Sequence, residues 1–262
     1  MDLLLPEAIG DGLRTGRFGR HIHYFEQAGS TNDIARDLAS AGAPEGTIVL
    51  AEAQTRGRGR LGRTWLAPPR SCLLLSIVLR PELPPAAAFR LTMLCSVAAA
   101  VAVGRTTGLA PAIKWPNDLL LHGKKLAGIL SESASTAERL EYVVVGLGLN
   151  VNFDPSSFPE IMATATSLRA ATGRDVSRVL LLREIMAEVE DRYPSLWPLG
   201  EDLLWQEWRR RMDTLGRQVT VTEGDHRECG LAVDVDRDGS LVLRRDDGSA
   251  VAIAVGDVSL RG

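Results

Sequence analysis

A loop rich in glycine and arginine has the residue types needed to bind an anion. It spans residues 54–65 with the sequence QTRGRGRLGRTW, and four arginines and three glycines fall between Arg56 and Arg63. Glycine lets the backbone adopt positive φ and turn N–H groups toward a ligand, and arginine adds bidentate contacts to carboxylate or phosphate. A mobile surface loop or a basic patch for RNA has the same composition. Composition alone leaves these alternatives open.

Two strand segments place a lysine next to polar or small residues. Residues 114–118, KWPND, end a buried strand with a cation, an amide and a carboxylate, at the kind of edge where α/β sheets hold ligands. Residues 125–130, KLAGIL, put a lysine before a glycine in an apolar strand, and such a glycine often marks close approach of a ligand. An ordinary turn in the first segment and a surface lysine in the second are the structural alternatives.

A glycine-containing segment, residues 146–152 with the sequence GLGLNVN, ends a valine-rich strand. It lacks the third glycine of a dinucleotide-binding fingerprint, and a proline-containing loop follows it where that fingerprint requires a helix. No glycine-rich segment carries the Gly-Lys-Ser/Thr of a P-loop either. The sequence therefore argues against both common nucleotide-binding motifs.

Hydrophobic patterning and turn residues predict the elements that must position these segments. The expected strands cover residues 21–25, 47–53, 72–79, 113–115, 119–121, 125–130 and 142–151. The expected helices start near the N-capping residues 30–33 and run toward residue 41, and cover residues 86–106, 177–191 and 202–212. Beyond residue 212 four short strands, 219–222, 229–236, 241–244 and 251–255, alternate with turns and predict a small antiparallel barrel. We therefore expect two domains, residues 1–212 and 213–262.

Composition narrows the class of protein. The chain has 262 residues, of which 45% are hydrophobic, and a formal net charge of -3, which argues against binding DNA through overall charge. Cys72, Cys95 and Cys229 lie too far apart to suggest a disulfide framework or a metal knuckle. No signal-peptide pattern opens the chain, and its most apolar stretch, Leu91 to Gly104, is shorter than the ~18 residues of a membrane span. A cytoplasmic location and no membrane contact are expected.

The order of these motifs resembles that of biotin–protein ligases. Ser30-Thr31-Asn32, Gln54 with the Gly-Arg loop, and the segments 114–118, 125–130 and 146–150 follow one another as in that family, and the resemblance runs from about residue 21 to the closing Ser259-Leu260-Arg261. It implies an α+β fold, in which a mixed β-sheet is flanked by helices as in the class II aminoacyl-tRNA synthetase/biotin synthetase-like catalytic domain. It also implies that the C-terminal barrel is SH3-like.

The resemblance implies a two-step reaction. Such ligases join biotin and ATP into biotinyl-5′-AMP with release of pyrophosphate, and then pass biotin to one lysine of a biotin carboxyl carrier domain of a biotin-dependent carboxylase. Mg²⁺ would arrive on the phosphates of ATP, with no metal site from the protein alone, and the protein would be a monomer or homodimer. An unmodified lysine has a pKa of ~10.4, so the acceptor must be deprotonated before it attacks.

The resemblance also assigns residues. Biotin contacts are implied for Ser30, Thr31, Asn32, Gln54, Arg58, Gly59, Arg60, Lys125 and Gly128. Contacts to ATP or the adenylate are implied for Arg60, Arg63, Trp65, Lys114, Asn117, Asn150 and Arg261. Catalytic roles are implied for Arg58 and Lys125 at the carboxylate–phosphate junction, Lys114 at the phosphoryl group and Asp118 at the acceptor lysine, for which we favour orientation over proton abstraction. The Gly-Arg loop resembles the family's ordering lid.

Two features depart from the common family pattern. Arg56 stands where the family usually has alanine, which adds charge before the first loop glycine. Bifunctional members carry an N-terminal DNA-binding module, whose three helices of ~11 residues each would need more than the residues 1–20 that precede His21. We therefore expect the monofunctional form and no operator binding.

Two rival functions make different predictions. A lipoate- or octanoate-transferring enzyme of the same superfamily would share the core fold, but its Gly-Gly-Gly signature is absent from this sequence. A non-catalytic RNA-binding protein would use Arg56 to Arg63 as its basic patch and bind in a strongly salt-dependent way. The RNA-binding hypothesis leaves Lys114, Asn117 and Lys125 without a role.

Overall fold

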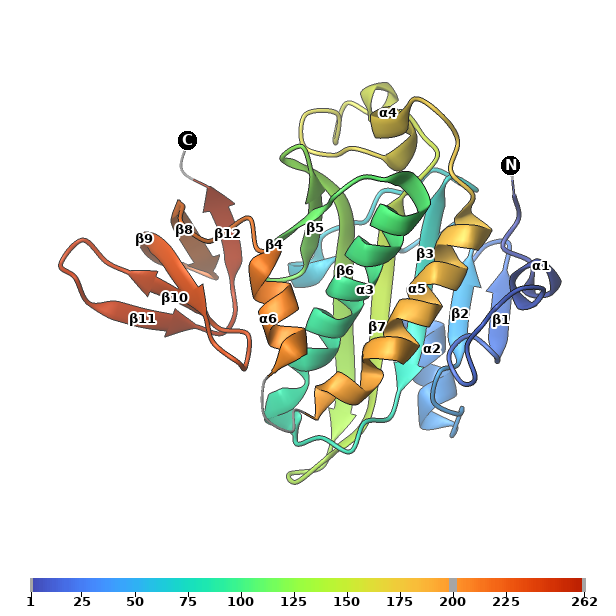
Figure 1. The fold of residues 1–262 in the computed structure, drawn as a ribbon, viewed down its shortest axis with the longest axis horizontal. Coiled ribbons are helices and arrows are strands. Elements are labelled where there is room, and N and C mark those ends of the chain that lie inside the picture. Colours follow the sequence, from blue (N-terminus) through green and yellow to red (C-terminus); the bar gives the residue numbers. More distant parts are fainter. Residues whose placement is uncertain (1, 198–201, 261–262) are drawn as a thin grey trace.

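The computed structural model describes residues 2–197 and 202–260 and contains a large mixed sheet covered by helices and a smaller antiparallel sheet (Figure 1). The large sheet has seven strands in the order β1-β2-β3-β7-β6-β5-β4. Only β1 and β2 pair in parallel within it, and the other neighbours are antiparallel. Its strands are β1 (Ile22–Phe25), β2 (Ile48–Ala51), β3 (Cys72–Leu79), β4 (Ala112–Lys114), β5 (Asp118–Leu121), β6 (Lys124–Ser135) and β7 (Leu140–Asn150).

Helices cover the two faces of this sheet unequally. The α-helices are α1 (Pro6–Gly10), α2 (Thr31–Ser40), α3 (Phe89–Thr107), α4 (Leu168–Thr172), α5 (Arg178–Arg192) and α6 (Leu203–Arg210). Helices α3 and α5 lie side by side across one face (Figure 1). Helix α2 packs against β2, β3 and β7. The alternating side chains of β3 show that α2 is on the other face, since Ile77 joins the core of α3 while Val78 packs with Ala35 of α2.

Helix α3 explains the most apolar stretch of the sequence. It is longer than the stretch from Leu91 to Gly104, and by length and composition alone it would suit a membrane span. Most of its residues from Arg90 to Val103 are nevertheless buried inside the protein, against α5, α6 and the sheet. The helix ends at Gly108, whose φ of 77° gives the left-handed C-cap that favours glycine. The helix expected over residues 86–106 is therefore part of the protein core.

The five C-terminal strands form an open antiparallel sheet. They are β8 (Gln218–Glu223), β9 (His226–Val235), β10 (Leu241–Arg244), β11 (Ala250–Ile253) and β12 (Asp257–Leu260), in the order β11-β10-β9-β8-β12. The predicted antiparallel arrangement is confirmed, with one strand more than expected. The expected closure is not observed, because within residues 202–260 β11 and β12 stay at opposite edges without pairing.

Two of the three cysteines lie inside the core. Cys72 and Cys95 are 1% and 2% exposed, and burial raises the pKa of each thiol to about 12. Because the thiolate is the reactive form, both should resist alkylation at pH 8, whereas partly exposed Cys229 should react. Brief N-ethylmaleimide treatment followed by mass spectrometry should show one adduct on the native protein and three after unfolding. Rapid native labelling of Cys72 or Cys95 would contradict this burial.

Candidate active site

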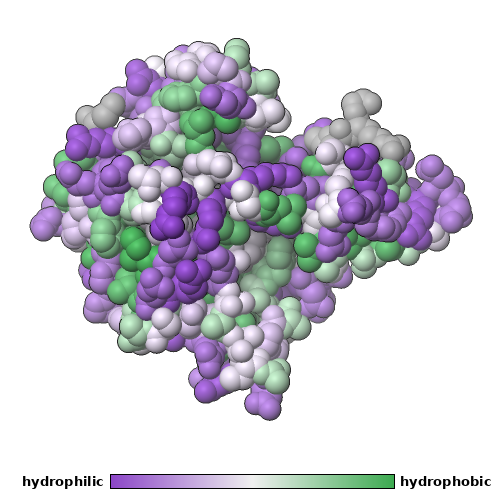
Figure 2. All heavy atoms as spheres, turned by 180° about the vertical axis from the view of Figure 1, so that it is seen from behind, coloured by the Kyte–Doolittle hydropathy of each residue, from purple (hydrophilic) through white to green (hydrophobic). Residues whose placement is uncertain are grey.

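A cavity of about 460 Å³ lies on the α2 face of the large sheet. This face is turned to the viewer in Figure 2, where hydrophilic side chains gather near the centre of the main body and the C-terminal sheet projects as a lobe. Every residue that the sequence nominated for the site lines the cavity, except Arg261, which is outside the described residues. Those residues are Ser30, Thr31, Asn32, Gln54, Arg58, Gly59, Arg60, Arg63, Trp65, Lys114, Asn117, Asp118, Lys125, Gly128 and Asn150.

Two glycines form the floor under Trp65. Gly128 of β6 and Gly148 of β7 are directly paired across the strands. A Cβ at Gly148 would lie 2.6 Å from Cε2 of Trp65, and one at Gly128 would lie 3.1 Å from its Cζ3. The indole therefore rests on bare backbone, which only glycine permits. Its Nε1 is buried and has no hydrogen-bond partner among the described residues, so it is the one indole donor left at the cavity.

Polar groups gather where α2 begins. Ser30 is the N-cap residue, but its side chain makes no capping hydrogen bond, so its hydroxyl is not consumed by the helix. Oε1 of Gln54 accepts hydrogen bonds from the backbone nitrogen of Thr31 at 2.6 Å and from its Oγ1 at 3.1 Å. This leaves the amide nitrogen of Gln54 as a donor beside a cluster of hydroxyls. The arrangement suits a small, uncharged ligand group that both donates and accepts hydrogen bonds.

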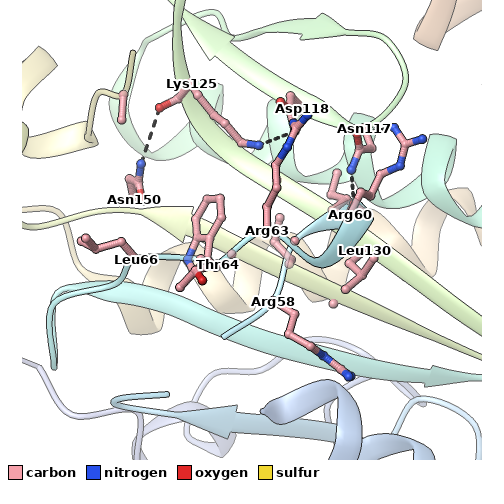
Figure 3. Close-up of a pocket in the computed structure, with 18 of the residues that line it drawn as sticks. Arg58, Arg60, Arg63, Thr64, Leu66, Asn117, Asp118, Lys125, Leu130 and Asn150 are labelled. Atoms are coloured by element: carbon pink, nitrogen blue, oxygen red, sulfur yellow. Dashed lines mark hydrogen bonds and ion pairs between the residues drawn. The ribbon is translucent and has the colours of Figure 1, made fainter. Parts of the chain in front are cut away.

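The cations of the cavity point in different directions. Nζ of Lys125 lies 2.8 Å from Oδ1 of Asp118, and the two side chains face one another in Figure 3. Arg58 extends the other way, with Nη2 2.5 Å from Oδ1 of Asp33 and 3.5 Å from Oε1 of Glu132. The structure therefore does not bring Arg58 and Lys125 to a common junction. Two carboxylates, from α2 and β6, account for the orientation of Arg58.

The C-terminal sheet supplies a carboxylate that no sequence motif predicts. Arg60 donates to Oδ1 of Asn117 at 3.4 Å and to the carbonyl oxygen of Gly256 at 3.2 Å, and lies 3.8 Å from Oδ1 of Asp257. Arg63 also pairs with Asp257. Asp257, the first residue of β12, thus closes one end of the cavity over the Gly-Arg loop. No motif could have indicated it, because a single aspartate in a short strand carries no spacing signal.

Burial lowers the pKa of Arg60, while the carboxylates of Asp257 and Asp118 act in the opposite direction. A guanidinium stays protonated in proteins despite such shifts. Arg60 is therefore a charged, half-enclosed donor whose present partners are protein oxygens.

Lys114 and Asn150 have contrasting surroundings. Lys114 is paired with Asp118 in the β4–β5 register, yet its ammonium makes no ion pair within the described parts of the chain. Asn150 is 3% exposed, and its Nδ2 donates to the carbonyl oxygen of Thr166 at 2.9 Å. Lys114 is thus available to an anionic ligand, whereas the amide of Asn150 ties β7 to the segment around residue 165.

Trp115 connects the segment 114–118 to the C-terminal sheet. Its side chain is 1% exposed, and Nε1 donates to the carbonyl oxygen of Gly239 at 2.8 Å. Its backbone nitrogen donates to Oγ1 of Thr214 at 3.0 Å. The family resemblance implies roles for the flanking Lys114, Asn117 and Asp118 but none for Trp115. Its role is to fix the position of the site relative to the second unit.

Several cations thus converge on one cavity that also has a neutral polar end and a flat aromatic surface. Lys114, Lys125, Arg60 and Arg63 are enough to hold phosphate or carboxylate oxygens, for which guanidinium and ammonium donors are well suited. Thr31 and Gln54 add uncharged hydrogen-bonding groups to the lining of the same cavity. The cavity can therefore hold a ligand with one neutral polar group and one or more anionic groups.

Known protein families match two parts of the chain. Residues 24–150 match the biotin/lipoate A/B protein ligase family, and residues 214–261 match the biotin protein ligase C terminal domain. The bifunctional ligase/repressor BirA of Bacillus subtilis is 36% identical over 94% of this chain and 76% of its own length. A biotin--[acetyl-CoA-carboxylase] ligase of Mycobacterium tuberculosis is 36% identical over 98% of this chain and 97% of its own. The biotin protein ligase of Aquifex aeolicus, solved with biotin and ATP, superposes with a TM-score of 0.77 at 26% identity, covering 92% of this chain and 99% of that one.

Proposed function

The chain belongs to the biotin protein ligase family, and we propose that it is an ATP-dependent biotin–protein ligase. It forms biotinyl-5′-AMP from biotin and MgATP with release of pyrophosphate. It then transfers biotin to a lysine of a biotin carboxyl carrier protein, with release of AMP and of one proton from the amine. The observation that carries this proposal is that motifs spread from Ser30 to Asn150 line one cavity with a neutral polar end and a cationic end. We include a cytoplasmic location in the proposal, in keeping with the burial of α3.

The activation step needs cations because a carboxylate attacks a phosphate. Two like charges ~4 Å apart repel by roughly 4 kcal/mol at an effective dielectric near 20. In the proposed reaction Lys125 and Arg60 offset this repulsion, and Lys114 stabilises the charge on the phosphoryl group. Arg58 can join them only after it leaves Asp33 and Glu132. The polar groups around Thr31 and Gln54 hold the ureido ring, whose donors and acceptor need partners once buried.

The transfer step requires an amine held against the acyl carbon of the adenylate. Asp118 lies at the same cavity and already pairs with an ammonium group, that of Lys125, at 2.8 Å. In the proposed reaction the same carboxylate orients the acceptor lysine of the carrier. Enclosing the adenylate within the Gly-Arg loop limits its hydrolysis by water.

The test is to incubate purified protein with MgATP and biotin, and in parallel with octanoate and lipoate, and to detect adenylates by mass spectrometry. Biotinyl-adenylate, followed by a mass increase on an added biotin carboxyl carrier domain, is the expected result. Adenylate with octanoate or lipoate alone would assign the protein to the acyl-transferring branch of the family. No adenylate from a folded sample that binds ATP would refute ligase activity.

Asp257 is expected to weaken ATP binding, because it occupies the arginines that the phosphates need. Asp257→Asn should lower the dissociation constant for ATP about two- to fivefold at low ionic strength, a gain typical of removing one partly exposed carboxylate from an ion pair. Titration calorimetry at low and at ~0.5 M salt should show the gain shrink as salt screens the charges. Asp225→Asn, in the exposed β8–β9 turn, makes the same change in net charge and should have no effect. Weaker ATP binding by Asp257→Asn would instead mean that this carboxylate positions the arginines for the phosphates.

A further inference from the structure

One hydroxyl interrupts the buried apolar run of β3. Ser76 is 0% exposed, and every residue of this strand is buried. A hydroxyl in such surroundings destabilises a protein unless it is hydrogen-bonded. An apolar residue would fill the strand more favourably, so the partners of Ser76 indicate why a hydroxyl stands there.

Both partners of Ser76 belong to the start of α2. Its Oγ lies 2.6 Å from Oδ1 of Asn32 and 2.8 Å from Oγ1 of Thr31. The amide oxygen of Asn32 can only accept, and a serine hydroxyl has a single proton. Ser76 therefore donates to Asn32 and offers its lone pairs to the hydroxyl of Thr31.

The strand next to β3 completes the enclosure of Asn32. Gly146 of β7 pairs directly with Ser76, and a Cβ at Gly146 would lie 2.1 Å from Oδ1 of Asn32. Nδ2 of Asn32 donates to the carbonyl oxygen of Leu130 at 3.2 Å and to Oε2 of Glu132 at 2.8 Å. Each end of the amide is thus held by protein groups. Because the amide groups of Asn32 are already hydrogen-bonded to other protein groups, we infer that Asn32 supports the site. The family resemblance implies instead that Asn32 contacts biotin directly.

The contacts of Ser76 and Gln54 also fix the position of Thr31. Its backbone nitrogen is fixed by Gln54, and its hydroxyl lies between Ser76 and Gln54. Thr31 lines the cavity, and after it donates its single proton to one of these oxygens, its Oγ1 can still accept a hydrogen bond. A fixed acceptor at that point suits an N–H donor of a bound ligand.

We propose that Ser76 is a positioning residue for the ureido ring of biotin, acting through Asn32 and Thr31, and that Gly146 leaves the space this contact requires. The inference rests on the proposed function, because it specifies which buried groups orient the acceptor for the ureido N–H. Ser76 does not touch the cavity itself, and no sequence motif includes it.

The test compares Ser76→Ala with Ser96→Ala in a steady-state assay of biotinyl-adenylate formation. Both serines are 0% exposed, but Ser96 donates only to the carbonyl oxygen of Thr92 within α3. Removing one partner of a buried hydrogen bond commonly costs about a tenfold change in binding. We expect Ser76→Ala to raise KM for biotin about tenfold, with kcat and KM for ATP within about twofold of wild type. Ser96→Ala should leave all three constants unchanged.

Two further measurements separate positioning from loss of structure. Desthiobiotin keeps the ureido ring, so its KM should rise by the same factor in Ser76→Ala. Gly146→Ala retains the serine but pushes on Asn32 from the other side, and should also raise KM for biotin selectively. If Ser76→Ala does not fold, Ser76→Cys takes its place, because a thiol is a weaker donor that still fills the site of the hydroxyl with a somewhat larger atom.

The outcomes distinguish this inference from the proposed function. An unchanged KM for biotin, or an equal rise in KM for ATP, would overturn the positioning role while wild-type activity leaves the ligase proposal intact. Wild-type protein that activates no biotin would overturn both proposals.

Discussion

Replacing Lys125 with methionine is expected to slow biotinyl-adenylate formation by about 100- to 1,000-fold. Nζ of Lys125 lies 2.8 Å from Oδ1 of Asp118 and 5.5 Å from the ring centroid of Trp65, beside the cationic end of the cavity. Methionine keeps a long unbranched side chain without the charge. The expected loss therefore reports on the ammonium group and not on the volume that the side chain fills.

The size of this effect follows from the charges that meet in the proposed reaction. The repulsion of roughly 4 kcal/mol between carboxylate and phosphate corresponds to about three powers of ten in rate if nothing offsets it. Arg58 cannot substitute while it pairs with Asp33 at 2.5 Å. Arg60 remains, so some activity should survive, which sets the lower end of the range.

Lys124→Met is the matched control, because it removes the same charge from the neighbouring residue. Lys124 is exposed, and its Nζ is 3.4 Å from the carbonyl oxygen of Met162, away from Asp118. Single-turnover measurements at saturating biotin and ATP should give a rate within about twofold of wild type for this control. If Lys125→Met changed only the KM for ATP at an unchanged single-turnover rate, Lys125 would be a binding group without a role at the junction.

The sequence predicts the strands of the large sheet well because burial and turns give them strong local signals. β3 was expected at residues 72–79 and is Cys72–Leu79, since an apolar run bounded by an arginine-rich loop and prolines has few other interpretations. The strand expected at residues 142–151 is the continuous β7, which passes through Gly146 and Gly148. Those glycines do not break the strand but make room for Asn32 and Trp65. Local propensity cannot show this, because the reason lies on other elements.

Some residues of the site could be predicted from local sequence patterns, and others could not. Lys114, Asn117 and Asp118 were predictable because they form one segment, and Gly128 because a glycine within an apolar strand is unusual. Ser76 and Asp257 were not, because each is an isolated polar residue whose partner is distant in the chain, as Arg63 is from Asp257. The family resemblance could assign Arg58 to the junction, but its orientation depends on Asp33 and Glu132, which no motif contained. Tertiary contacts decide these cases.

The segment before β1 contains the short helix α1. In the structure it is anchored by a buried ion pair: Nη1 of Arg178, which is 0% exposed, lies 2.6 Å from Oε2 of Glu52 and donates to the carbonyl oxygen of Cys72 at 3.1 Å. Oε1 of Glu52 accepts from the backbone nitrogen of Leu4 at 2.9 Å, and Arg178 also contacts Asp2. One charge pair thus connects the N-terminal segment, the end of β2 and α5.

Breaking this pair should have the largest effect on stability of any single substitution considered. Arg178→Met leaves the Glu52 carboxylate buried and unpaired, for which about 3–5 kcal/mol of destabilisation is expected. For a chain of this size that lowers the unfolding temperature by roughly 6–20 °C, measurable by calorimetry. Arg70→Met removes one arginine from an exposed pair, 3.7 Å from Glu26, and should cost at most about 1 kcal/mol.

The double variant Arg178→Met/Glu52→Leu shows whether the stability lost in Arg178→Met comes from the unpaired charge or from packing. If the penalty comes from an unpaired buried charge, removing both charges should restore part of the stability lost in Arg178→Met. Equal stability of the single and double variants would show that packing, not charge, holds this junction. Glu52 directly follows β2 and lies two positions before Gln54, so the restored variant should also recover any biotin affinity lost with the pair. A double variant that is stable but still binds biotin weakly would show that Glu52 positions Gln54 independently of its effect on folding.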